Sequence, residues 1–102
     1  MIEQIGSSSL PGDELVSQGL ADLKEDRVTE LALLVLIAAP QLNRLGLDVP
    51  ARPSLRPYEH QLYARLEERL GTAALSHYNS LIRRVVSYTR ALERERSRLS
   101  VP

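Results

Sequence analysis

Cysteine, phenylalanine and tryptophan are absent from this chain of 102 residues. Without cysteine, the chain can form neither a disulfide framework nor a metal site with thiolate ligands. Aromatic residues are limited to four tyrosines, so a core must be built mainly from leucine, valine, isoleucine and alanine. Hydrophobic residues still make up 43% of the chain, which indicates a folded protein, and the length suits a single domain.

Long apolar runs are also missing. The longest run covers residues 31–39, whereas a membrane-spanning helix needs about 20 apolar residues. The opening MIEQIGSSS has neither the basic start nor the apolar stretch of a secretion signal. We therefore expect a cytoplasmic protein that does not enter a membrane, with residues 1–9 as a disordered tail and residues 10–102 as a single helical-bundle domain.

Lysine occurs once, against twelve arginines, and the formal net charge is zero. This balance hides an asymmetry along the chain. Residues 1–51 carry three basic and eight acidic residues, a net charge of −5, and residues 52–102 carry ten and five, a net charge of +5. A division of this kind indicates an interaction surface, or two halves that pack on each other.

Four segments repeat apolar residues at intervals of three and four, and no segment has the alternation of paired strands. This pattern predicts an all-α fold, a small helical bundle of four main helices with a long C-terminal helix. The first helix is predicted over residues 12–26. Its inward residues are expected to be Leu15, Val16, Gly19, Leu20 and Leu23, and its solvent-facing residues Glu14, Gln18, Asp22 and Glu25.

The second helix is predicted to begin after Thr29, a residue type that caps helix N-termini. It reads ELALLVLIAA, with apolar side chains in every direction, so we expect burial on most sides. Pro40 lacks a backbone N–H and restricts Ala39, which predicts a break there and then a short helical segment closed by Gly46. The three prolines of residues 47–57 predict an extended connector.

The third helix is predicted over residues 57–70 and the fourth over residues 73–98, with Gly71 between them. The fourth helix has a seam of residues at alternating spacings, made up of Leu75, Tyr78, Ile82, Val85, Thr89 and Leu92. At 1.5 Å per residue this helix is about 39 Å long, more than the roughly 30 Å width of a small domain. Its last turns are expected to project into solvent or to pack on a second chain, so a homodimer is a reasonable prediction.

Residues suited to catalysis are sparse. The two histidines, His60 and His77, lie on different predicted helices, and neither a metal-ligand spacing, a nucleophile motif nor a glycine-rich phosphate loop occurs. No acidic residue falls inside an apolar stripe, where burial would raise its pKa. We therefore predict no enzyme activity, no metal and no cofactor. A small helical hydrolase is the alternative from another class, and it requires both histidines to lie close together beside an arginine.

A row of arginines on the fourth predicted helix is the most distinctive feature of the sequence. Arginine occupies positions 83, 90, 94 and 98 and serine occupies position 87, so the spacings are four, three, four and four residues. On a helix these positions share one narrow strip, with a further arginine at position 84 beside it. The candidate partner-binding residues are Arg83, Arg84, Arg90 and Arg94.

Three interpretations of this strip stay open. The first is that the strip is a solvated face whose positive charge is partly offset by Glu93 and Glu95. The second is that it meets an acidic protein surface, and the third is that it contacts nucleic-acid phosphates. The acidic surface belongs to the line of Glu14, Asp22 and Glu25 in the same chain, to a second copy, or to a different protein. A neutral chain without aromatic residues beside the arginines argues against nucleic acid. We therefore predict a non-catalytic protein-interaction module that binds an acidic partner through its C-terminal helix, with a nucleic-acid-binding regulator as the alternative.

Two stretches resemble a group of known proteins. Residues 20–50, LADLKEDRVTELALLVLIAAPQLNRLGLDVP, and residues 77–94, HYNSLIRRVVSYTRALER, look like small helical proteins of GC-rich bacteria whose genes lie beside nucleotidyltransferase-like toxins. The resemblance covers about half of the chain. It implies a non-catalytic partner protein with an antitoxin-like role, and it assigns no functional residue because no diagnostic motif accompanies it.

Overall fold

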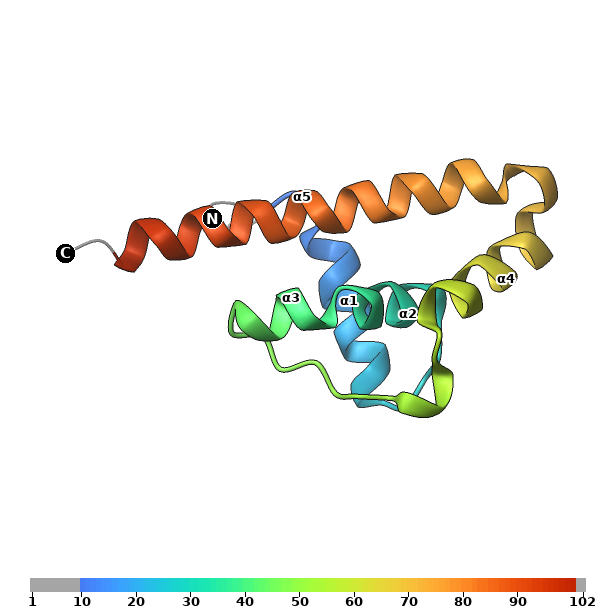
Figure 1. Cartoon of the computed structure of the whole chain (residues 1–102), viewed down its shortest axis with the longest axis horizontal. Helices are drawn as coiled ribbons and strands as arrows, with labels where there is room; N and C mark the ends of the chain where they lie inside the picture. Colours follow the sequence, from blue (N-terminus) through green and yellow to red (C-terminus); the bar gives the residue numbers. More distant parts are fainter. Residues whose placement is uncertain (1–9, 101–102) are drawn as a thin grey trace, which may run out of the picture.

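The computed structural model describes the backbone of residues 10–100 and the side chains of residues 10–97. Over these residues the chain forms five α-helices, two 3-10 helices and no strand (Figure 1). The elements in order are α1 (Asp13–Lys24), α2 (Glu30–Ile37), α3 (Ala39–Arg44), η2 (Pro53–Leu55), α4 (Tyr58–Leu70), η3 (Gly71–Ala73) and α5 (Ala74–Ser100). The predicted all-α bundle of four main helices with a long C-terminal helix is confirmed, and α3 is the short segment expected after the break. The predicted tail, residues 1–9, lies outside the described residues.

The hydrophobic core is centred on α2. Its residues 32–36 are each at most 1% exposed, and α1, α4 and α5 all pack against it. A helix of eight residues is too short to be stable alone, so burial among its neighbours is what stabilises it. The prediction that this segment is buried on most sides is confirmed.

Local signals set the ends of α2 and α3. The Thr29 side chain accepts a hydrogen bond from the Ala32 backbone N–H at 3.1 Å, as the predicted N-cap requires. Pro40 lies in the first turn of α3, where backbone N–H groups make no hydrogen bond within the helix, so its missing N–H costs none. The prediction for Ala39 is wrong by one residue, because the break falls at Ala38 and Ala39 already begins α3. The chain leaves α3 through Gly46, whose φ of +99° suits glycine.

Two glycines let α1 approach its neighbours closely. A Cβ atom on Gly19 would lie 2.5 Å from the Leu31 carbonyl oxygen of α2, and one on Gly12 would lie 2.7 Å from the Arg84 carbonyl oxygen of α5. Both distances are well below a normal van der Waals contact, so neither position has room for a side chain. In addition, Gly12 has a φ of +80°. As a result α1 is held against α2 along its length and against α5 at its start.

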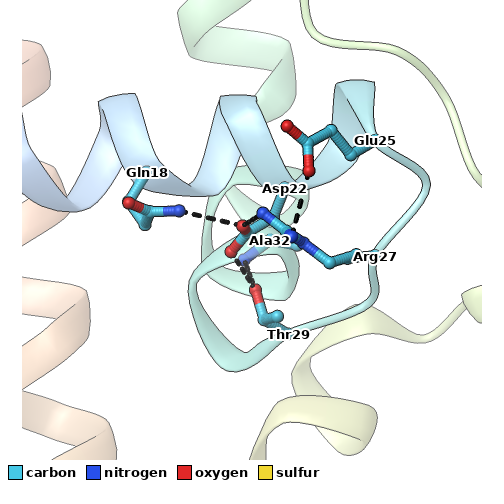
Figure 2. A network of polar contacts seen from close by, with 6 residues as sticks. All are labelled: Gln18, Asp22, Glu25, Arg27, Thr29 and Ala32. Atoms are coloured by element: carbon cyan, nitrogen blue, oxygen red, sulfur yellow. Dashed lines mark hydrogen bonds and ion pairs between the residues drawn. The ribbon is translucent and has the colours of Figure 1, made fainter.

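Asp22 is buried in the fold, so the prediction that it lies on the solvent-facing side of the first helix is wrong (Figure 2). Its residue surface is 4% exposed, and its carboxylate accepts hydrogen bonds from Thr29 Oγ1 at 2.6 Å, Gln18 Nε2 at 2.9 Å and Arg27 Nη2 at 3.0 Å. Figure 2 shows that the turn after α1 brings Thr29 and Arg27 back over the carboxylate. Hydrogen bonds from Thr29 and then Gln18 lower the pKa of Asp22, so burial does not leave it protonated.

The stability of the protein is expected to fall in acid, in part through Asp22. A carboxylate whose pKa is lower in the folded state stabilises the fold at pH values above its unfolded pKa of about 3.8. That stability is lost as the pH falls through the lower folded pKa. We expect Asp22→Asn to lower the melting temperature at pH 7, and the difference from the native chain to shrink towards pH 2.5. Circular dichroism melts at a series of pH values check this, and a difference that stays constant would contradict it.

The long helix α5 is continuous over 27 residues, or about 40 Å at 1.5 Å per residue, within a longest molecular dimension of 47 Å. The predicted seam is confirmed at Val85 and Thr89, which are buried, but is wrong at Leu75, which is 56% exposed. The turn η3 sets Ala74 against the core at 1% exposure. Successive helical residues point about 100° apart, so Leu75 is turned outward.

The last described turns of α5 are mostly exposed, as expected for a projecting helix end, and approach the rest of the fold at Arg96. The Arg96 guanidinium lies over the turn after α3, 3.1 Å from the position that a Cβ atom on Gly46 would occupy. Figure 1 shows α5 running past α3 before the helix ends. Glu93, Arg94, Arg96 and Ser97 are nonetheless exposed, so the last described turns of α5 are largely open to solvent.

Candidate functional site

The outer face of α5 carries only arginine, serine and asparagine. Taking Val85 as the centre of the buried face and 100° per residue, Ala91 falls at 120° but is only 7% exposed, and the positions turned 120° or more away that are not buried are Ser76, Asn79, Ser80, Arg83, Ser87, Arg90, Arg94 and Ser97. None of them is acidic, and the nearest carboxylates on this helix, Glu93 and Glu95, lie on its two flanks. We call this surface the arginine face. It is a row of hydrogen-bond donors suited to an anionic partner.

The structure places Arg83, Arg84, Arg90 and Arg94 in solvent. Within residues 10–97, none of the four guanidinium groups forms an ion pair or a hydrogen bond. The arginines that do form ion pairs in this part of the chain are Arg27, Arg52 and Arg69. The acidic line predicted on the first helix does not meet the strip, since the Asp22 carboxylate is occupied by Arg27. The intrachain interpretation of the strip is therefore wrong for the described residues.

The three arginines of the face form an extended row. At 1.5 Å per residue, Arg83 and Arg90 are about 10 Å apart along the axis and Arg90 and Arg94 about 6 Å apart. Each guanidinium can donate two parallel hydrogen bonds to a carboxylate or a phosphate. Arg84 is exposed but lies to the side, towards α1, where its own carbonyl group contacts Gly12. The side chain of Arg98 lies outside the described residues.

Apolar side chains lie directly beside the arginine face. Leu75 and Val86, at 56% and 37% exposure, are the large hydrophobic residues that α5 exposes. Val86 lies three residues after Arg83 and four before Arg90, so both cations flank it on the helix surface. It also lines a hollow of about 240 Å³ together with Ile37, Ala38, Pro40, Gln41 and Thr89. This hollow could not be predicted from the sequence, because the residues that line its two sides lie some 50 residues apart in the chain.

The described residues contain neither a candidate metal cluster nor a hydrogen-bonded histidine. Within them, no three histidine, cysteine, aspartate or glutamate side chains gather closely enough to hold a metal ion. His60 and His77 are exposed on α4 and α5, and neither forms a hydrogen bond or ion pair with residues 10–97. Nor does any helix of residues 10–100 have both the length and the apolar character needed to cross a bilayer. The absence of a metal cluster does not test the hydrolase alternative, which stays a prediction.

Comparisons with known proteins leave the family open. No protein-family model, no curated protein and no solved structure matches this chain. The resemblance to antitoxin-like proteins therefore stays a prediction from sequence.

Proposed function

We propose that this chain is a non-catalytic helical interaction module that binds an acidic protein partner through the arginine face of α5. Arg83, Arg90 and Arg94 make the main contacts, and Arg84 contributes at the edge. The observation that supports this most strongly is a row of exposed guanidinium groups without internal partners on one continuous helix. An antitoxin-like or regulatory role in the cytoplasm is the biological form of the proposal.

A bound partner explains the arginine face better than solvation alone. Arg90 and Arg94 are four residues apart, a like-charge spacing that destabilises a helix by about 0.2–0.5 kcal/mol. Elsewhere the chain places charges of both signs together, as on α4, where Arg65 lies close to Glu67 and Glu68. It also pairs them, since the Arg69 guanidinium donates two hydrogen bonds of 2.8 Å to the Glu30 carboxylate. The absence of any such mixing on the outer face of α5 fits a surface that is neutralised by another molecule.

A protein partner fits this surface better than nucleic acid does. Val86 provides apolar contact between Arg83 and Arg90, and Leu75 provides it nearer the start of α5, as protein interfaces require and phosphates do not. The chain is neutral, so it lacks the broad positive field that draws nucleic acid, and no aromatic residue lies on the face for base stacking. The serine and asparagine donors would also suit phosphate oxygens, so nucleic acid is the second outcome that the tests address.

The experiment compares charge reversal on and off the arginine face. The chain is used to recover partners from a lysate of its source organism, and the dissociation constant of the purified partner is then measured. Arg90→Glu with Arg94→Glu is expected to weaken binding by about 100-fold, since like charges face each other across the interface. The matched control, Lys24→Glu with Arg65→Glu, makes the same change in net charge at other exposed positions and is expected to change affinity less than about threefold.

Two results would overturn the proposal. One is an unchanged dissociation constant for the face variant while its circular dichroism stays native. The other is tight binding of a generic DNA duplex or RNA strand that weakens linearly with the logarithm of salt concentration, as phosphate contacts produce. We expect no binding of either nucleic acid at low salt by fluorescence anisotropy. A homodimer along α5 is a separate prediction, which light scattering of the chain alone checks.

A further inference from the structure

A second series of residues along α5 has the spacing of a coiled-coil seam. The alternation of four and three residues runs through Leu75, Asn79, Ile82, Val86 and Thr89. This series lies beside the buried face of α5. Leu75, Asn79 and Val86 are exposed and Ile82 is partly buried, whereas Thr89, at 5% exposure, belongs to the buried face. Glu93 occupies the next position, so the apolar part ends there. From Leu75 to Thr89 the series covers about 21 Å, or some 14 residues of a helix packed alongside.

Arginines flank this series on its outer side. Arg83 follows Ile82, and Arg90 follows Thr89, which are the positions that set partner choice in coiled coils by pairing with opposite charges. On the inner side the corresponding residues, Tyr78 and Val85, belong to the core. A helix packed on this series would therefore need its acidic edge on the outer side only.

The opposite wall comes from the break between α2 and α3. The change of direction at Ala38 leaves Ile37 partly exposed and Pro40 exposed, and both line the 240 Å³ hollow with Val86. That volume is below the roughly 300 Å³ at which small-molecule sites begin, but it suits an anchoring side chain of a docked helix. A further hollow of about 470 Å³ also includes Ile37 and Pro40, so the apolar surface continues round the same corner towards Tyr58.

We infer that the partner docks with an amphipathic α-helix, acidic along one edge, in the groove between α5 and the α2–α3 corner. Leucine or isoleucine side chains of that helix contact Val86 and Ile37, and its carboxylates pair with Arg83 and Arg90. This inference rests on the proposed function and adds the structural element that the partner supplies. The chemistry indicates a different protein, because among residues 10–97 the exposed large hydrophobic side chains of a second copy are Leu75 and Val86, and the arginines that flank Val86 would repel Arg83 and Arg90.

Synthetic peptides and amide chemical shifts test the inference. The probe is a fluorescent 18-residue amphipathic helix with leucine along one stripe and glutamate along one edge of that stripe. Two matched peptides replace glutamate with lysine, or interrupt the helix with proline at unchanged charge. We expect the glutamate peptide to bind, with amide shift changes concentrated in residues 37–41 and 82–90. The lysine peptide is expected not to bind, and the interrupted peptide to bind at least about tenfold more weakly, since it must lose its seam contacts.

Variants separate the groove from the arginine face. Val86→Glu is expected to weaken glutamate-peptide binding more than about tenfold, while Ser17→Glu, which adds the same charge at an exposed position of α1, leaves it unchanged. If Arg83→Gln with Arg90→Gln weakens binding but Val86→Glu and the proline interruption do not, the inference is overturned and the proposed function stands. Absence of glutamate-peptide binding at millimolar concentration, or equal binding of the lysine peptide, also overturns the inference. The lysate partner then decides the proposed function separately.

Discussion

Replacing Gly19 with valine is expected to abolish cooperative folding. A Cβ atom at this position would lie 2.5 Å from the Leu31 carbonyl oxygen and 2.5 Å from Val35 Cγ2. The carbonyl oxygen belongs to the backbone of α2, so the clash is relieved only if α1 moves away. That movement exposes Val16 and Leu23, each 1% exposed in the native fold, at about 1.5–3 kcal/mol per side chain. Together these two side chains cost about 3–6 kcal/mol, a large part of the net stability of about 5–15 kcal/mol that a small domain has.

Alanine at the same position gives a sharper version of this test. Helix propensity alone favours alanine over glycine by about 1 kcal/mol, so Gly19→Ala would stabilise an isolated α1. Because α2 lies so close, Gly19→Ala is expected to destabilise the protein instead, and the free energy of unfolding should fall by at least about 2 kcal/mol. Gly71→Ala is the comparison, because a Cβ atom there meets nothing within 4 Å and the backbone strain at a positive φ alone costs about 1–3 kcal/mol. Urea unfolding curves measure both, and a Gly19→Ala chain more stable than the native one would show that α1 and α2 are further apart.

Truncation of Leu34 is expected to be the second most damaging change. Leu34 is 0% exposed and lies at the centre of α2, where α1 and α4 pack on either side. Removing three carbons there both loses their burial and leaves a cavity, which costs about 2–5 kcal/mol. For a chain of this length, a loss of 1 kcal/mol lowers the melting temperature by roughly 4–8 °C. We therefore expect Leu34→Ala to lower the melting temperature by more than about 10 °C.

The matched control removes the same atoms at an exposed leucine. Leu75 begins the seam predicted from sequence, but it is 56% exposed in the fold. Leu75→Ala is expected to change stability by less than about 0.5 kcal/mol, as is usual for surface positions. A loss at Leu75 comparable to that at Leu34 would show that the sequence prediction had the register of α5 right and that Ala74 does not face the core.

Features that depend on a few neighbouring residues could be predicted from the sequence. The cap at Thr29, the break near Pro40 and the helix end at Gly71 each follow from the backbone chemistry of one residue type. The burial of α2 follows from apolar side chains on all its sides, because no orientation leaves such a helix solvated. The arginine face is of the same kind, since helical periodicity alone places its members on one strip.

Features that depend on contacts between distant segments could not be predicted. Two overlapping series run along α5, one through Ala74, Leu81 and Val85 and one through Leu75 and Val86, and the sequence supports both. Packing against α2 and α4 selects the first, which leaves Leu75 and Val86 exposed.

Asp22 shows the same limit at the level of one side chain. It lies on the polar side of α1 by periodicity, and only the return of the chain through Thr29 buries it. The sequence does contain polar residues around the turn after α1 that can donate hydrogen bonds to a carboxylate. Helical periodicity describes one helix at a time, so it cannot predict that these residues fold back onto Asp22.

The proposed function requires carboxylates of a partner protein to pair with Arg90 and Arg94, and a charge-swap experiment tests this pairing directly. The dissociation constant of the Arg90→Glu, Arg94→Glu chain is measured against the native partner and against a partner whose contacting acids are changed to arginine. We expect the swapped pair to recover affinity to within about tenfold of the native pair, because opposite charges face each other again. If the swapped partner binds the reversed chain no better than it binds the native chain, the arginine face is not where the partner binds.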